Sequence, residues 1–266
     1  MHLRTRAILI ALLAALLPLA TSAPAPVAAQ EWVEVDAPKE RKIRMAVVRP
    51  RGSGPLPVVV VLHGTEGFSR KYVSLAESFA REGFLAVAGC WFAGSHFGNQ
   101  RPPDFIPCAQ APDFVGANLE AVKDVMALVD AVRKLPGARA DRVGLFGHSR
   151  GAVIAVLVAS GGGNVQAVVA SAAHYTRTRP RRDVTDTLPI TLVKDLQAPV
   201  LILYGTADEL IDPSEPRAYE QALRSEGKTF ESHAYPGAPH ALPFAPRTRD
   251  DVFRRSIAFF KKHLGN

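Results

Sequence analysis

The five residues Gly147-His148-Ser149-Arg150-Gly151 place a serine between two glycines, a pattern suited to nucleophilic chemistry. Residues 142–146 before the motif predict a strand, and the apolar run 152–160 after it predicts a helix. A serine on such a strained turn is pushed out at the end of a sheet, and flanking glycines let the strand and the helix pass closely. The first N–H groups of the helix would point toward an oxyanion formed there. Ser149 is therefore the candidate nucleophile.

A candidate acid follows a later strand. A serine hydroxyl becomes a good nucleophile when a base takes its proton, so the motif predicts a histidine and a carboxylate downstream. Residues 201–204 predict a strand, and the turn after it carries Asp208. Asp212 is the alternative acid, although beside Pro213 it also suits a turn or a helix cap.

The candidate base is His240, which lies in the loop 236–240 between a predicted strand and the last predicted helix. With Asp208 it gives the chain order serine, acid, histidine that this arrangement requires. The other histidines fit less well, because His233 lies within a strand, His174 follows a different strand, His263 belongs to the terminal helix, and His63 and His148 precede the serine.

Two backbone donors are needed to hold the oxyanion. The N–H of Arg150, directly after the nucleophile, is the first candidate. The second should come from the loop 63–67, which follows the strand at residues 58–62 and contains two glycines. Glu66 in this loop either contacts the resting serine or is an ordinary solvated glutamate.

Alternating apolar runs and amphipathic stretches supply the elements that position these residues. The predicted strands cover residues 43–48, 57–62, 84–88, 142–146, 165–170, 199–204 and 229–235, and the predicted helices cover 71–82, 114–135, 152–160, 214–225 and 249–264. This alternation predicts a mostly parallel sheet with helices on both faces. Residues 30–266 are expected to form one domain, with irregular insertions at 90–112 and 172–196.

Residues 1–29 have the layout of a signal peptide. A basic start with Arg4 and Arg6 precedes an apolar run over residues 7–17 and a small-residue stretch ending at Ala29. The alternative is a buried N-terminal helix. The apolar run is short for a membrane anchor. We expect cleavage near Ala29 and a periplasmic or secreted protein with no stable membrane anchor.

Cys90 and Cys108 are the two cysteines of the chain. In an exported protein such a pair is expected to form a disulfide. The bridged loop would contain Trp91 and Phe92, which either line an apolar substrate pocket or pack in the interior.

The net charge of +7 falls to +5 on signal removal, because residues 1–29 contain two arginines and no acids. Basic residues are scattered apart from the run Arg177, Arg179, Arg181 and Arg182, which is either a solvated loop or a site for an anionic substrate. No aromatic interleaving or groove-reading helix indicates a nucleic-acid partner.

The ordered set of His63-Gly64, Gly147-x-Ser149-x-Gly151, Gly205-Thr206-x-Asp208 and Tyr235-Pro236-Gly237-x-x-His240 resembles the α/β-hydrolase superfamily. Its short form without a large cap domain, and its Tyr-Pro-Gly-Ala-x-His ending, resemble the dienelactone hydrolase family. The resemblance implies hydrolysis of small esters or lactones without a metal or an organic cofactor. Glu66-Gly67-Phe68 resembles the family's segment with a glutamate near the nucleophile, which would make Gly67 the second oxyanion donor.

Two departures from the family pattern bear on the substrate. Dienelactone hydrolases proper use cysteine as the nucleophile and are generally cytosolic. In this chain the nucleophile elbow, residues 147–151, has serine, and we expect the protein to be exported. Both favour a more general carboxylesterase. The elbow is also compatible with thioester hydrolases and acyltransferases of the same superfamily, and a non-catalytic binding protein on this scaffold is the alternative from another class.

Overall fold

The computed structural model describes residues 30–52, 54–93, 102–108, 118–176 and 187–265. Its elements in chain order are β1 (Glu31–Ala37), β2 (Arg41–Val48), β3 (Leu56–Leu62), α1 (Arg70–Arg81), β4 (Leu85–Gly89), α2 (Asn118–Val132), β5 (Ala138–His148), α3 (Arg150–Ser160), β6 (Ala167–Ser171), the 3₁₀ helix η1 (Pro189–Asp195), β7 (Val200–Gly205), α4 (Ser214–Ser225), β8 (Phe230–Tyr235) and α5 (Arg249–Leu264). Every predicted strand and helix is present. The sequence patterns missed β1 and η1.

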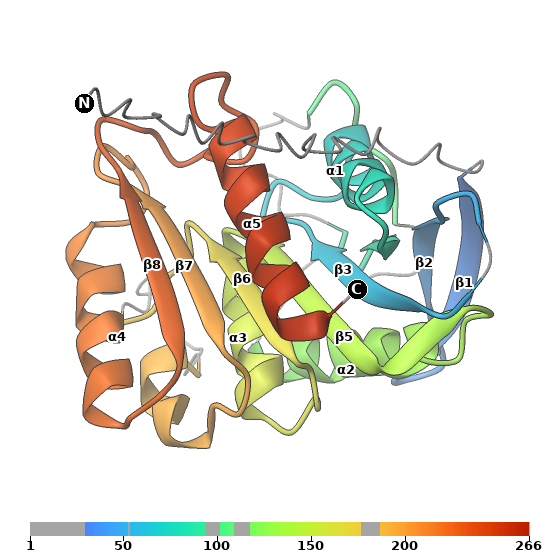
Figure 1. The fold of residues 1–266 in the computed structure, drawn as a ribbon, viewed down its shortest axis with the longest axis horizontal. Coiled ribbons are helices and arrows are strands. Elements are labelled where there is room, and N and C mark those ends of the chain that lie inside the picture. The colour runs from blue at the N-terminus through green and yellow to red at the C-terminus, as the bar shows by residue number, and fades with distance from the viewer. Residues whose placement is uncertain (1–29, 53, 94–101, 109–117, 177–186, 266) are drawn as a thin grey trace, which may run out of the picture.

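All eight strands belong to one sheet with the order β1-β2-β4-β3-β5-β6-β7-β8 (Figure 1). The β1–β2 and β2–β4 pairs are antiparallel. The other six strands, β3 to β8, run parallel to one another. Parallel strands bring their carboxyl ends to the same edge of a sheet, which is where ligands bind in open α/β folds. The loops after β5, β7 and β8 therefore meet at one edge.

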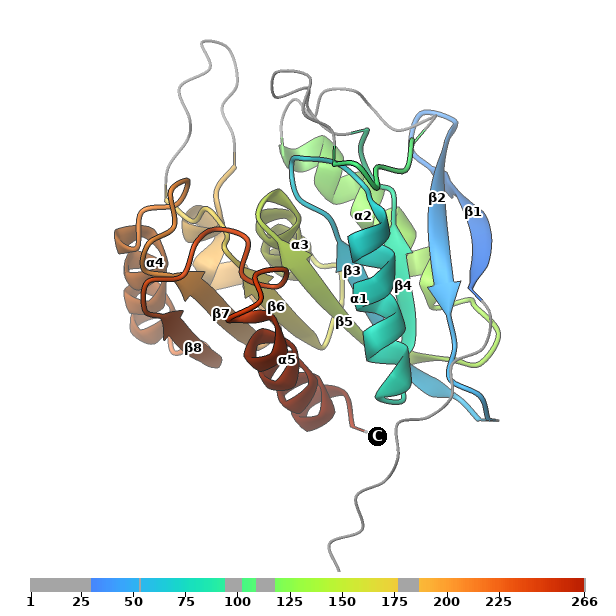
Figure 2. The same cartoon turned by 90° about the horizontal axis from the view of Figure 1, so that it is seen from above.

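Helices cover both faces of the sheet (Figures 1 and 2). In β3, Val58, Val60 and Leu62 belong to one buried core, which α2, α3 and α4 complete. Val59 and Val61 belong to a second core, which α1 and α5 complete. Burial on both faces explains the near-continuous valine run of this strand. The predicted α/β-hydrolase fold, a mostly parallel sheet with helices on both faces and no large cap domain, is confirmed.

Two predicted features fall outside the described residues: the signal peptide at 1–29 and the arginine run at 177–182. Among the helices in the described ranges, none is long and apolar enough to cross a membrane.

Candidate active site

Ser149 lies on the turn between β5 and α3, at the carboxyl edge of the parallel strands. Its backbone has φ 54° and ψ −121°, a conformation that a residue with a side chain rarely adopts. The Ser149 N–H donates to the carbonyl of Ser171 at 2.8 Å, which ties the turn to the end of β6. The strained turn expected at the predicted nucleophile is therefore present, and such strain concentrates at functional sites.

The glycines on either side of the turn are required by close approach of backbone. A Cβ atom on Gly147 would lie closer than 3.0 Å to the backbone of Ala152 in α3. A Cβ atom on Gly151 would lie closer than 3.0 Å to the carbonyl oxygens of Leu62 and His63 at the end of β3. Backbone atoms cannot move aside as a flexible side chain can, so only glycine fits at both positions.

Asp208 and His240 form a buried pair at the same edge. The Asp208 Oδ2 atom lies 2.8 Å from Nδ1 of His240, and the Asp208 side chain is 1% exposed. Its other oxygen accepts the N–H groups of Leu210 and Ile211 at 2.8 and 2.9 Å. Burial alone would raise the Asp208 pKa, but the histidine and the two amides lower it overall, so the carboxyl stays ionised.

His240 lies beside the elbow. Its ring centroid is 5.2 Å from that of His148, the residue before Ser149. Burial lowers the pKa of His148 to about 3, so this neighbouring ring is neutral near pH 7. The His240 backbone N–H donates to Oε2 of Glu209 at 3.2 Å, a support that the sequence patterns did not indicate. The carboxylate of Asp208 thus orients a histidine next to the predicted nucleophile.

The two predicted oxyanion donors differ in their surroundings. Arg150 is the first residue of α3, where backbone N–H groups have no acceptor within the helix. The Gly67 N–H donates to the carbonyl of Gly64 at 3.1 Å and closes a turn over residues 64–67. Gly67 can therefore serve an oxyanion only by sharing its N–H between two acceptors.

Glu66 in this turn is held by two side chains from α1. The hydroxyl of Tyr72 donates to Glu66 Oε1, and Nζ of Lys71 lies 2.9 Å from the same oxygen. Burial opposes ionisation of Glu66, but His148, Lys71 and Tyr72 together lower its pKa to about 2. Glu66 is thus an ionised, partly buried residue of the site. The sequence patterns did not indicate Tyr72 or Lys71, which lie at the start of a predicted helix.

Trp91 and Phe92 are buried and pack against His63. Their ring centroids lie 5.3 and 5.0 Å from the His63 ring, and the Phe92 ring is stacked on it. Burial lowers the pKa of His63 to about 4, which keeps this ring neutral. The two aromatic residues therefore pack in the interior against His63, which is one of the two roles that the sequence left open for them.

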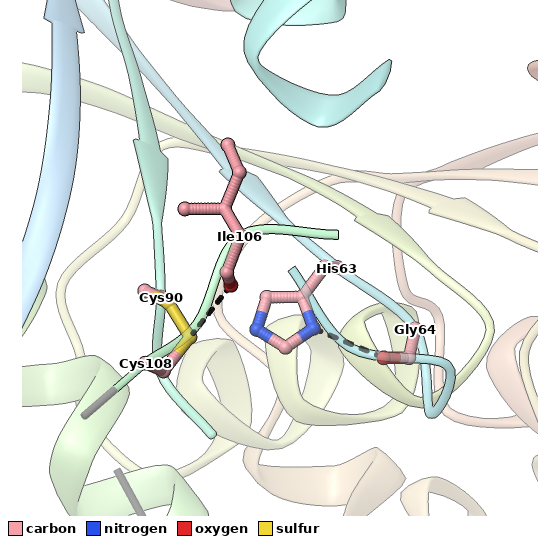
Figure 3. Close-up of a disulfide and its surroundings, with 5 residues drawn as sticks. All are labelled: His63, Gly64, Cys90, Ile106 and Cys108. Atoms are coloured by element: carbon pink, nitrogen blue, oxygen red, sulfur yellow. Dashed lines mark hydrogen bonds between the residues drawn. A yellow bond between two sulfur atoms is a disulfide. The ribbon is translucent and has the colours of Figure 1, made fainter. Parts of the chain in front are cut away.

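The predicted disulfide between Cys90 and Cys108 is confirmed, with a Cα–Cα distance of 5.7 Å (Figure 3). It joins Cys108 to Cys90, the residue after β4, and residues 102–108 also contact the start of α1. In this contact the Ile106 N–H donates to the Phe68 carbonyl at 2.9 Å, and Asp104 accepts the N–H groups of Arg70 and Lys71 at 3.0 and 2.9 Å. The bridge thus closes the segment that hydrogen-bonds to the helix whose first residues hold Glu66.

Three other histidines of the described residues have different partners. His174 faces Glu215 on α4, at 3.3 Å between Nδ1 and Oε1, while His233 packs on Tyr235 and His263 packs on Phe259. Across the described ranges, no group of three His, Cys, Asp or Glu side chains is placed to hold a metal ion.

Residues 43–264 match the dienelactone hydrolase family. A Bradyrhizobium protein assigned provisionally as a 2-oxo-3-(5-oxofuran-2-ylidene)propanoate lactonase is 25% identical, over 89% of this chain and 95% of its own length. A Salmonella typhimurium protein assigned provisionally as a carboxymethylenebutenolidase is 30% identical, over 82% of each chain. A Klebsiella pneumoniae crystal structure, assigned provisionally as a dienelactone hydrolase, has a TM-score of 0.73 and 24% identity and covers 89% of this chain and 100% of that one. This chain therefore belongs to the dienelactone hydrolase family.

Proposed function

We propose that this protein is an exported serine hydrolase that cleaves carboxylic esters or lactones through an acyl-enzyme intermediate. The observation that carries the proposal is the 2.8 Å bond between Asp208 and His240, placed beside the strained elbow of Ser149. A nucleophile, an oriented base and an ionised acid are the groups that acyl transfer to a serine requires.

In the acylation step, the Ser149 oxygen attacks the ester carbonyl carbon while His240 takes the hydroxyl proton. Asp208 holds Nδ1–H of His240, so that Nε2 is the nitrogen that accepts this proton. The Arg150 amide and the shared Gly67 amide stabilise the oxyanion. The C–O bond to the leaving group then breaks, and His240 gives its proton to the departing alkoxide.

In the deacylation step, His240 takes a proton from water, and the resulting hydroxide attacks the acyl carbon. The bond to the Ser149 oxygen breaks, the proton returns to that oxygen, and a carboxylic acid leaves. With a lactone the first step opens the ring, so both product groups leave as one hydroxy acid. The provisional names of the relatives favour lactones as one substrate class.

Export accounts for two features together. Residues 1–29 have the pattern of a signal peptide, and the Cys90–Cys108 disulfide suits an oxidising compartment. The protein recovered from the periplasm or medium should begin near Gln30, and its intact mass measures this directly. A secreted or periplasmic product that retains residues 1–29 would contradict cleavage.

Turnover of p-nitrophenyl acetate and butyrate, a simple lactone and an acyl thioester tests the reaction class. Wild-type protein should hydrolyse the esters or the lactone faster than the thioester. Ser149→Ala should reduce turnover to the background level, since it removes the attacking oxygen. Undiminished turnover in that variant would contradict the proposal, and a faster thioester reaction would favour the thioester hydrolase alternative.

A further inference from the structure

The hydroxyl of Tyr72 bonds to two residues of the 64–67 turn, which is expected to supply an oxyanion donor. It accepts the Gly64 N–H at 2.9 Å and donates to the carboxylate of Glu66. Tyr72 is fully buried in the first turn of α1. Burial and the adjacent Glu66 charge raise its pKa well above the ordinary value of 10.0, so the hydroxyl keeps its proton and remains a donor.

The turn lies directly against the nucleophile. A Cβ atom placed on Gly64 would be 3.2 Å from Cβ of Ser149 and closer than 3.0 Å to Oε2 of Glu66. A small displacement of the Gly64–Gly67 turn would therefore change the distance between its amides and any oxyanion at Ser149. Such displacements lower rate, because donors act only when they are aimed at the developing charge.

The ring of Tyr72 contacts the loop that follows His240. It packs edge-on against Phe244, with ring centroids 5.2 Å apart. Phe244 in turn packs edge-on against His148 at 5.5 Å, and the ammonium of Lys71 lies 4.5 Å from its ring centroid. One buried side chain thus touches the turn beside Ser149 through its hydroxyl and the His240 loop through its ring.

We propose that Tyr72 is a positioning residue for the hydrolysis reaction, which fixes the Gly64–Gly67 turn relative to Ser149 and to the loop of His240. The inference rests on the proposed function and deepens it. Tyr72 does not touch the reacting atoms. It acts by holding the Gly64 amide and the Glu66 carboxylate in place, so that the turn keeps one geometry as charge develops on the substrate.

The variant Tyr72→Phe tests this, because it keeps the ring and removes the hydroxyl. We expect kcat for p-nitrophenyl butyrate to fall about tenfold, equivalent to about 1.4 kcal/mol of transition-state stabilisation. KM should stay within about threefold, since the ester contacts its binding surface as before. The matched control is Tyr235→Phe, which also removes a buried tyrosine hydroxyl bonded to a carboxylate, that of Asp251 at 3.0 Å.

The comparison separates positioning from stability. Both variants should melt at lower temperature than wild type, but only Tyr72→Phe should lose kcat. A second variant, Phe244→Leu, removes the ring contact and keeps the Tyr72 hydroxyl, so it should also lose kcat at nearly constant KM. Wild-type kcat in both Tyr72→Phe and Phe244→Leu, or an equal loss in Tyr235→Phe, would overturn the inference. An inactive wild-type protein would overturn the proposed function and this inference with it.

Discussion

Replacing Asp208 with asparagine changes the charge of the acid and leaves its shape. In the wild-type chain one carboxylate oxygen accepts the amides of Leu210 and Ile211, at 2.8 and 2.9 Å. The carbonyl oxygen of an asparagine can keep both of these bonds. Its NH₂ group then takes the place of the oxygen that lies 2.8 Å from Nδ1 of His240. A donor therefore replaces an acceptor at this atom.

This exchange reverses the tautomer of the histidine. Nδ1 of His240 must now accept, so the proton of the neutral ring moves to Nε2, which is the nitrogen that should take the Ser149 proton. The same change in serine proteases with these three groups lowers kcat about 10⁴-fold, equivalent to about 5.5 kcal/mol. The folded state loses one charge-assisted hydrogen bond, worth about 1.5–3 kcal/mol, so the variant should still fold.

The assay is steady-state hydrolysis of p-nitrophenyl butyrate, with a thermal melt of each variant. Asp212→Asn is the matched control, because Asp212 also follows β7 and accepts the Ser214 N–H at 2.8 Å, a bond that asparagine keeps. We expect wild-type kcat in the control. If Asp208→Asn keeps more than about one-tenth of kcat, the barrier rises by less than about 1.4 kcal/mol, and Asp208 is then not the acid that orients His240. A larger loss in Asp212→Asn would make that residue the acid.

Three further predictions concern the fold. Gly151→Ala should lower the free energy of unfolding in urea by on the order of 3 kcal/mol, because the added Cβ meets the Leu62 carbonyl. Gly162→Ala is the matched control. Its added Cβ would have no atom within 4 Å, so only its φ of +86° should cost stability, about 1 kcal/mol. Reducing the disulfide, whose cysteines are 18 residues apart, should lower stability by about 3 kcal/mol; an unchanged melting temperature with dithiothreitol would contradict its supporting role. Burial lowers the pKa of His63 to about 4 and of His148 to about 3, so below 6.5 the unfolded chain binds protons that the folded chain does not. Urea unfolding at a series of pH values should show stability falling from pH 6.5 toward 4, by up to about 1.4 kcal/mol per pH unit for each histidine; a flat profile would contradict this.

The sequence was most informative where one physical requirement dominated. The valine run of β3 requires burial on both faces, and the chain order of Ser149, Asp208 and His240 places all three after parallel strands. Because these strands end at the same edge, the order along the chain predicts that the loops meet. The elbow glycines are explained in the same way, by backbone atoms that leave no room for a side chain.

Some contacts of the folded chain are not indicated by any local sequence pattern. β1, by contrast, carries a local signal that was missed, the alternation of apolar and acidic residues over residues 33–37 at the edge of the sheet. The sequence around Trp91 and Phe92 does not tell whether they line a pocket or pack on His63, as they do in the structure. The bonds of Tyr72 to Gly64 and Glu66 form because the first turn of α1 packs against the 64–67 turn in the folded chain.

We propose that Ser149 is the nucleophile of a hydrolase. The direct test is to treat the folded protein with a fluorophosphonate and to locate the adduct by peptide mass spectrometry. This reagent forms a bond to the oxygen of an activated serine and releases fluoride. We predict one adduct per chain, on the peptide that contains Ser149, and none in Ser149→Ala or in heat-unfolded protein. Wild-type protein that remains unlabelled while it hydrolyses esters, or an adduct on another serine, would show that Ser149 is not the nucleophile.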